Sequence, residues 1–154
     1  MMTGVLPDIL APGLQVVICG EAAGAMSLER GHYYASPNND FWKLLHESGL
    51  TPRRLQPDED ATLLGYGIGL TDLDKGEGMD IPRFRRKMEQ YRPAWVAVHS
   101  MKVARLLHPK PEFGLQAWRL ADSKVFVLRS PSGAARGPKQ LGSWRELADL
   151  LKEE

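Results

Sequence analysis

The order in which strand-like and helix-like segments follow one another is the feature that most constrains the fold of this chain. Short runs rich in β-branched residues each end at a loop, and most are followed by a segment with apolar residues at helical spacing. Parallel strands need such helical crossovers, and the helices then cover both faces of the sheet. The sequence therefore predicts an α/β fold with three layers, α/β/α, around a short, mainly parallel central sheet.

The same patterns place the individual segments along the chain. Strands are expected at residues 14–19, 94–100 and 123–129, and residues 64–73, which contain three glycines, are expected to form a strand edge or a loop. Helices are expected at residues 39–49, from about residue 80 to 93, at 101–107 and at 142–154. The first helix begins at Asn39 or Asp40 as its cap, and the last begins at Ser143.

Composition sets the broad class of the protein. With 154 residues, 43% of them hydrophobic and 25% charged, the chain is long enough for one domain, residues 1–154, with its own core. No stretch approaches the roughly 20 apolar residues of a membrane span, and the first residues do not resemble a signal peptide, so we expect a cytoplasmic protein. A single cysteine, Cys19, and four scattered histidines argue against a disulfide and a metal site.

Charge and strand ends indicate where a ligand would bind. The net charge is only +1, so contact with nucleic acid would depend on local basic clusters, such as those at residues 83–87 and 129–139. In parallel sheets, ligands bind at the carboxyl ends of the strands. Three segments qualify by this rule: GEAAGAMS (20–27), GLTDL (69–73) and SPSGAAR (130–136).

Four segments carry a family resemblance. They are residues 16–42 (VVICGEAAGAMSLERGHYYASPNNDFW), 65–73 (GYGIGLTDL), 87–98 (KMEQYRPAWVAV) and 130–136 (SPSGAAR). In this order and spacing they are similar to the mismatch-specific uracil/thymine DNA glycosylases of the uracil-DNA glycosylase superfamily. The motifs of that family read G-I-N-P-G followed by an aromatic, Ala, Pro and N-x-F-W, then G-x-G-x-T, K-x-x-x-Y-x-P and N-P-S-G. The resemblance extends from about residue 16 to 151 and implies a uracil-DNA glycosylase-like fold.

The resemblance also implies an activity and a set of site residues. The activity is DNA base excision repair, in which the enzyme binds uracil-containing DNA, flips the base out and hydrolyses its bond to deoxyribose, releasing free uracil without a cofactor. Tyr34 matches the aromatic that stacks on the base, Asn39 matches an amide that binds its edge, and Gly20 and Gly24 match loop glycines. The DNA-insertion loop is implied to contain Ser132, Gly133, Ala134 and Arg136. Without the resemblance, Tyr34 would be a core aromatic and Asn39 a helix cap.

One residue departs from the family pattern at the centre of the expected site. Ala22 occupies the position of the Asn that holds the attacking water, and a methyl group cannot do this. Two carboxylates lie close enough in the motifs to replace it. Asp72 follows Thr71, which matches a family Thr that contacts the water, and is the preferred candidate; Glu21 is the alternative, although neighbours on an extended segment point in opposite directions.

Other residues receive weaker assignments. His99 ends a predicted strand and can reach the site, but a structural histidine is the commoner case. His32 is expected to contact DNA or shape the pocket, and Cys19 to be a small core residue. Ala134 is a small residue where the family often carries an apolar wedge, which puts a preference for mismatched duplexes in doubt unless Arg136 fills the gap.

Three classes of function remain open from the sequence. The first is a monofunctional uracil-DNA glycosylase, acting as a monomer with no Schiff-base lysine. The second is a catalytically silent binder of uracil-containing or damaged DNA, which Ala22 favours. The third is an unrelated α/β nucleotide-binding protein, which lacks support because neither G-x-G-x-x-G nor G-x-x-x-x-G-K-[ST] is present.

Overall fold

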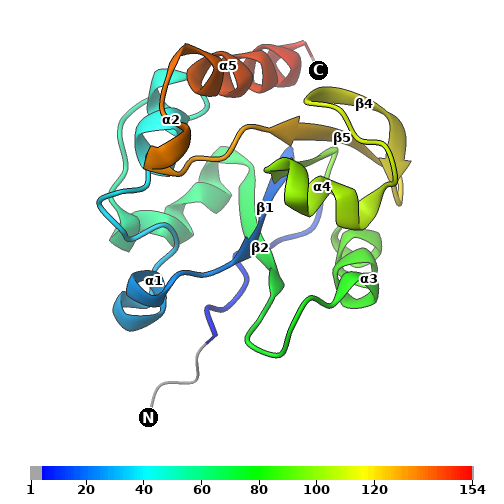
Figure 1. Ribbon diagram of the computed structural model, residues 1–154, viewed down its shortest axis with the longest axis horizontal. Helices are drawn as coiled ribbons and strands as arrows, with labels where there is room; N and C mark the ends of the chain where they lie inside the picture. Colours follow the sequence, from blue (N-terminus) through cyan, green and yellow to red (C-terminus); the bar gives the residue numbers. More distant parts are fainter. Residues whose placement is uncertain (1–4, 154) are drawn as a thin grey trace.

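A five-stranded sheet with helices on both faces forms the centre of the molecule (Figure 1). The computed structural model describes residues 5–153. Its strands are β1 (Val16–Ala22), β2 (Ile68–Asp74), β3 (Trp95–His99), β4 (Gly114–Leu120) and β5 (Ser123–Leu128). They lie in the order β2-β1-β3-β5-β4, with β2, β1, β3 and β5 parallel and β4 antiparallel to β5. The prediction of an α/β/α fold around a mainly parallel sheet is confirmed.

The helices form the two outer layers. They are α1 (Ala25–Arg30), α2 (Phe41–Glu47), α3 (Ile81–Tyr91), α4 (Met101–Leu107) and α5 (Pro138–Lys152), with 3-10 segments η1 (Pro57–Tyr66) and η2 (Gly133–Ala135). An apolar core lies between the sheet and each helix layer. Helices α2 and α5 pack on one face of the sheet, and α3 and α4 pack on the other. Figure 1 shows α2 beside α5. Among the described helices, none has the length and hydropathy needed to cross a membrane.

Alternation along β1 and β2 decides which side chains can meet at the ends of these strands. Ile18 packs in the α2/α5 core, whereas Cys19 packs in the α3/α4 core. On β2, Leu70 lies on the α2/α5 face and Leu73 on the α3/α4 face. Successive side chains on a strand point to opposite faces, so the residues two positions beyond Ile18 and Leu70 also point to the α2/α5 face.

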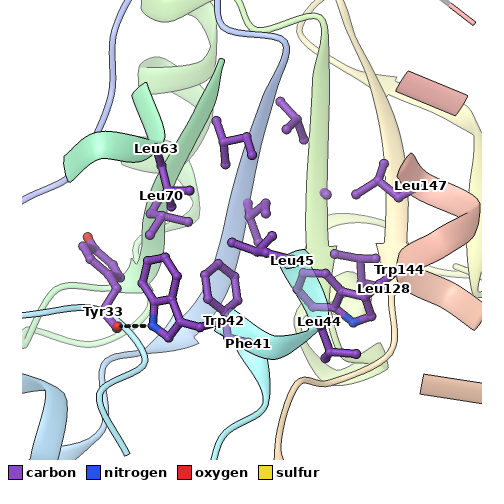
Figure 2. Close-up of a cluster of buried hydrophobic side chains, with 14 of the residues drawn as sticks. Tyr33, Phe41, Trp42, Leu44, Leu45, Leu63, Leu70, Leu128, Trp144 and Leu147 are labelled. Carbon is purple, nitrogen blue, oxygen red and sulfur yellow. Dashed lines mark hydrogen bonds between the residues drawn. The ribbon is translucent and has the colours of Figure 1, made fainter. Parts of the chain in front are cut away.

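In the α2/α5 core, aromatic residues of α2 and α5 pack among leucines (Figure 2). Phe41 and Trp42 from α2 meet edge to face, and Trp144 from α5 also meets the ring of Phe41 edge to face. The indole Nε1 of Trp42 donates to the carbonyl of Tyr33 at 3.1 Å, which fixes the loop that precedes α2. This core therefore supports the chain segment that carries Tyr34.

Two sequence predictions about element bounds are wrong. The C-terminal helix begins at Pro138, not near Ser143, because Pro138 with its fixed φ can start a helix. Ser143 lies inside α5 and uses its Oγ to accept the backbone N–H of Arg129 at 3.0 Å. Strand β1 continues to Ala22, three residues past the predicted end at Cys19, because it pairs with β2 along that whole length.

Candidate functional site

The carboxyl ends of β1, β2 and β3 bring Gly20, Asp72 and His99 together. Gly20 is paired with Asp72 in the β1–β2 register, so both residues point to the α2/α5 face. A Cβ atom on Gly20 would lie 2.7 Å from Nε2 of His99 and 3.2 Å from Oδ1 of Asp72. Only glycine lets both side chains approach this closely, which gives a physical reason for Gly20.

Tyr34 extends this cluster on the side of α2. Its hydroxyl lies 2.7 Å from Nε2 of His99, and its ring stacks on Phe41 with centroids 3.8 Å apart. Burial lowers the pKa of His99 to about 4 and raises the pKa of Tyr34, so the hydroxyl donates to a neutral imidazole. Tyr34 has a φ of 52°, a strained conformation for a bulky residue that is characteristic of functional sites.

Asp72 and Ala22 line one cavity of about 200 Å³. The remaining walls come from Val5, Leu6, Ala23, Leu28, Asp74, Lys75 and Gly76. Burial raises the pKa of Asp72 to about 6, even though the positive charge of Lys75 opposes the shift. Because residue 22 is alanine, the cavity stays open beside the carboxylate of Asp72, whose pKa lies near neutral pH.

Lys75 connects Asp72 to a buried polar network. Its Nζ lies 3.9 Å from Oδ2 of Asp72 and 2.8 Å from Oδ1 of Asp8. The same Nζ also donates to the hydroxyl of Tyr33 at 2.9 Å and to the carbonyl of Leu6 at 3.0 Å. Sequence reasoning missed Lys75, although it lies only three residues after Asp72 and the next turn had to place it nearby.

Asp8 is the second carboxylate of this network. Burial opposes its ionisation, but hydrogen bonds from Lys75, Lys87 and Thr71 outweigh that effect and lower its pKa. Thr71 donates its Oγ1 to Oδ1 of Asp8 at 2.6 Å. No motif pointed to Asp8, and the motif that contains Lys87 gave no sign of its contact with Asp8, because this contact depends on tertiary packing between the N-terminal segment and α3.

Glu21, Thr71 and Gly24, which were also predicted for the site, do not line the Ala22 cavity. Glu21 points to the opposite face of the sheet, where its Oε1 pairs with Nζ of Lys102 at 2.9 Å. Thr71 is fully buried on that face and its hydroxyl is directed to Asp8, not to the Ala22 cavity. Gly24 caps α1, and nothing in the described chain lies within 4 Å of where its Cβ would be.

Asn39 lies with Tyr34 on a second cavity, of about 430 Å³. This cavity also has arginine side chains on its wall, Arg30 and Arg54. The Oδ1 of Asn39 accepts the backbone N–H of Phe41 at 2.9 Å, so Asn39 also stabilises the start of α2. Both roles considered for Asn39 are thus compatible with its position.

The predicted insertion loop, residues 130–136, is held against the segment before α2. The N–H of Gly133 donates to the carbonyl of Asn38 at 2.7 Å. Arg136 forms two hydrogen bonds with Asp40, of 2.7 and 2.9 Å, and lowers the pKa of that carboxyl group. Ser132 accepts the N–H of Ala134 through its Oγ at 3.2 Å, and Ala134 is exposed. Ala134 is therefore exposed on a loop whose backbone these hydrogen bonds hold in place.

The remaining sequence predictions concern Cys19, His32 and a metal site. Cys19 is fully buried in the α3/α4 core and burial raises the pKa of its thiol, which confirms it as a core residue. Nδ1 of His32 lies 3.3 Å from Oδ1 of Asp60. Within residues 5–153, no group of three or more His, Cys, Asp or Glu side chains is arranged to hold a metal ion.

Comparison with known proteins identifies the family. The sequence model of the Uracil DNA glycosylase superfamily matches residues 7–152. The fold is similar to a solution structure described as a "putative Uracil DNA glycosylase from Methanosarcina acetivorans", with a TM-score of 0.71, 19% sequence identity, and coverage of 96% of this chain and 97% of that chain. The chain therefore belongs to the uracil-DNA glycosylase superfamily, and this membership supports a role as a DNA glycosylase.

Proposed function

We propose that this protein is a monofunctional uracil-DNA glycosylase, related to the mismatch-specific branch, in which Asp72 activates the attacking water. One observation carries the proposal: a buried carboxylate with a pKa of about 6 faces the cavity that Ala22 leaves open. A general base works best when its pKa lies near the working pH. The missing side chain at position 22 is then replaced by a carboxylate from the neighbouring strand.

The proposed reaction balances with water alone. The water oxygen forms a bond to the anomeric carbon while the bond to N1 of uracil breaks and its electron pair leaves with the base. Asp72 accepts the proton of the water, and its charge stabilises the cationic character that develops on the sugar. The uracil anion then takes up a proton from solvent as Asp72 releases one, so the products are free uracil and an abasic deoxyribose, and no cofactor takes part.

Tyr34, Asn39 and His99 support the binding half of the proposal. Phe41 covers one face of the Tyr34 ring, so the flipped base would stack on the other face. His99 holds the Tyr34 hydroxyl and acts as a positioning residue. Asn39, on the cavity that Tyr34 also lines, would bind the edge of the pyrimidine.

Lys75 does not support a second, covalent activity. Its Nζ donates to oxygens of Asp8, Tyr33 and Leu6, and an amine engaged in this way has no lone pair free to attack the sugar. Lys75 and Asp8 act as positioning residues. Nζ of Lys75 holds the carboxylate of Asp72 through Oδ2, and Asp8 in turn holds Nζ of Lys75. The enzyme would therefore leave the abasic strand uncut.

The test is uracil release from oligonucleotides that carry uracil single-stranded, opposite guanine or opposite adenine. Asp72→Asn keeps the shape of the side chain but removes the base, and is expected to lower the rate by about 10²–10⁴-fold. Glu21→Gln is the matched control, because it neutralises a carboxylate next to Ala22 that points to the other face. A rate unchanged by Asp72→Asn would refute the assignment of the base.

The alternative function is a catalytically silent binder of uracil-containing or damaged DNA. The observation that favours it is Ala22, which carries no polar atom. It predicts that wild-type protein binds the uracil oligonucleotides with no release from any of them, and that Asp72→Asn leaves binding unchanged. Release by the wild-type protein from a single substrate would exclude this alternative.

A further inference from the structure

The largest of the cavities described, of about 630 Å³, shares no lining residue with the Ala22 cavity or the Asn39 cavity. It is bounded by the start of α4, the segment that precedes β4, the insertion loop and the start of α5. Its lining includes Ser100, Phe113, Arg129, Arg136 and Lys139. The proposed glycosylase reaction assigns no role to this groove.

An aromatic ring and a guanidinium group form a preassembled pair on the wall of the groove. The side chain of Phe113 is 42% exposed, which is unusual for so large an apolar residue. Cζ of Arg129 lies 4.1 Å from the centroid of that ring. Arg129 is anchored by its backbone N–H, which donates to Oγ of Ser143. A nucleobase can stack on an aromatic ring or on a guanidinium plane, so the pair offers a platform for one base.

The charge of the groove suits a nucleic-acid backbone. Its charged lining residues in the described chain are all basic: Arg129, Arg136 and Lys139. Arg136 is already paired with Asp40, whereas Lys139 is exposed at the start of α5. Lys139 is therefore the residue placed to meet a phosphate next to the stacked base.

The groove adjoins two segments that belong to the proposed site. Ser100, on its wall, directly follows His99, and Arg136 belongs to the insertion loop. Ser100 has φ 81° and ψ 145°, a conformation that residues other than glycine rarely adopt and that marks functional segments. A DNA strand whose flipped base contacts Tyr34 would have its neighbouring nucleotide within reach of the groove.

We propose that this groove binds a nucleotide that flanks the excised base, with its base stacked on Phe113 and Arg129 and its phosphate near Lys139. The inference rests on the proposed function, because it takes the occupant to be the substrate strand. It adds a subsite that favours unpaired DNA, since a flanking base can stack there only when it has left the duplex stack.

The test measures binding of a fluorescein-labelled, single-stranded 11-mer of thymidines by anisotropy over a range of salt concentrations. Phe113→Ala is expected to weaken binding roughly tenfold, as loss of one stacked base does, without changing the salt dependence. Lys139→Gln is expected to make the slope of log K against log salt less steep by about 0.7, as loss of one phosphate contact on a single strand does. Because the probe contains no uracil, neither result depends on catalysis.

Matched controls separate the groove from general surface effects. Leu115→Ala removes an exposed apolar side chain that does not line the groove. Arg119→Gln removes an exposed charge on β4 that lies outside the groove and outside both basic clusters, residues 83–87 and 129–139. Leu115→Ala and Arg119→Gln are expected to bind like the wild type. The proposal is overturned if Phe113→Ala binds within twofold of the wild type, if Leu115→Ala loses as much affinity, or if the wild type does not bind the strand. Groove-dependent binding without uracil release from any substrate would overturn the proposed function alone.

Discussion

The hydroxyl of Tyr34 lies 2.7 Å from Nε2 of His99, so the aromatic ring expected to stack on the base is tied to the end of β3. This bond joins residues 65 positions apart in the sequence and holds a ring whose backbone is strained. The position of the ring therefore depends on the imidazole as well as on the stack with Phe41.

Tyr34→Phe tests this dependence. It keeps the ring but leaves the buried Nε2 of His99 without its donor, which is expected to lower the free energy of unfolding by about 1–3 kcal/mol. We expect uracil release to fall roughly tenfold, because a loss of about 1.4 kcal/mol in positioning changes a rate by that factor. Urea denaturation and single-turnover release measure the two effects. Unchanged stability and rate would show that the hydrogen bond has no part in holding the ring.

Gly20→Ala is expected to damage the site through a steric clash. The new Cβ would lie 2.7 Å from Nε2 of His99, so the imidazole must move, at a cost of roughly 1–3 kcal/mol in stability. Release should fall with it, because the hydroxyl of Tyr34 is hydrogen-bonded to the displaced imidazole, and the new Cβ would also lie 3.2 Å from Oδ1 of Asp72. Gly24→Ala is the control, since the same change there meets open space and an ordinary φ of −73°. Equal behaviour of the two variants in thermal unfolding would contradict the prediction.

The rate of uracil release is expected to depend on the ionisation of Asp72. Since burial raises its pKa to about 6, the active carboxylate is lost as the pH falls below 6, and the rate should drop roughly tenfold per pH unit there. Lys75→Met removes the positive charge that opposes this shift, so the acid limb should move to higher pH. Lys102→Met, beside Glu21, should leave the profile in place. A profile flat between pH 5 and 8 would rule out Asp72 as the base.

Stability should respond to pH through two opposing groups. The raised pKa of Asp72 means that its ionised form destabilises the fold above pH 6, and that this penalty disappears as the pH falls toward 4. The pKa of His99 is lowered to about 4, so stability is lost as the pH falls from about 6.5 to 4. The two effects partly cancel in the wild type.

Asp72→Asn removes one of these two groups. At pH 8 it should raise the free energy of unfolding by up to about 3 kcal/mol, the equivalent of a two-unit shift, and this gain should vanish near pH 4. The variant should therefore lose more stability than the wild type between pH 7 and 4.5. Urea unfolding at several pH values measures this, and a variant less stable than the wild type at pH 8 would contradict it.

The size of residue 134 is expected to control the use of duplex DNA. Ala134 is exposed at the insertion loop and has room for a larger side chain. Ala134→Leu would supply an apolar wedge that fills the space of the flipped base, so release from uracil opposite guanine should rise by roughly five- to tenfold relative to the single strand. The ratio of the two rates, measured in one preparation, is the readout. A lower ratio in the variant would show that the loop does not enter the stack.

The arrangement of layers was predictable because it rests on local patterns. Short apolar runs and helical periodicity identified β1, β3, β5, α3 and α4, and Asp80 caps α3 as its position before Pro82 indicates. Strand β4 was missed, because its exposed face and a register irregularity with β5 break the apolar run. The 3-10 segment η1 was missed as well, since its residues lack a regular apolar stripe.

The site was predictable only where a motif carried it. Asp72 and Gly20 stood out because they lie in segments that match family motifs, and the pairing of β1 with β2 places them side by side. The same alternation sets Glu21 apart from Asp72, which the sequence could suggest but not decide. No motif covered Asp8 or Lys75, and the motif that contains Lys87 did not indicate its partner, because these contacts join segments that only the folded chain brings together.

The strand order has a consequence for the order in which the proposed site can be completed. Gly20, Asp72 and His99 precede α4 in the sequence, whereas the insertion loop and β5, which covers the outer edge of β3, follow it. During synthesis, β1, β2 and β3 therefore leave the ribosome before the strand that pairs with this edge of β3. We expect the proposed excision activity to appear only after residues 123–136 have been added.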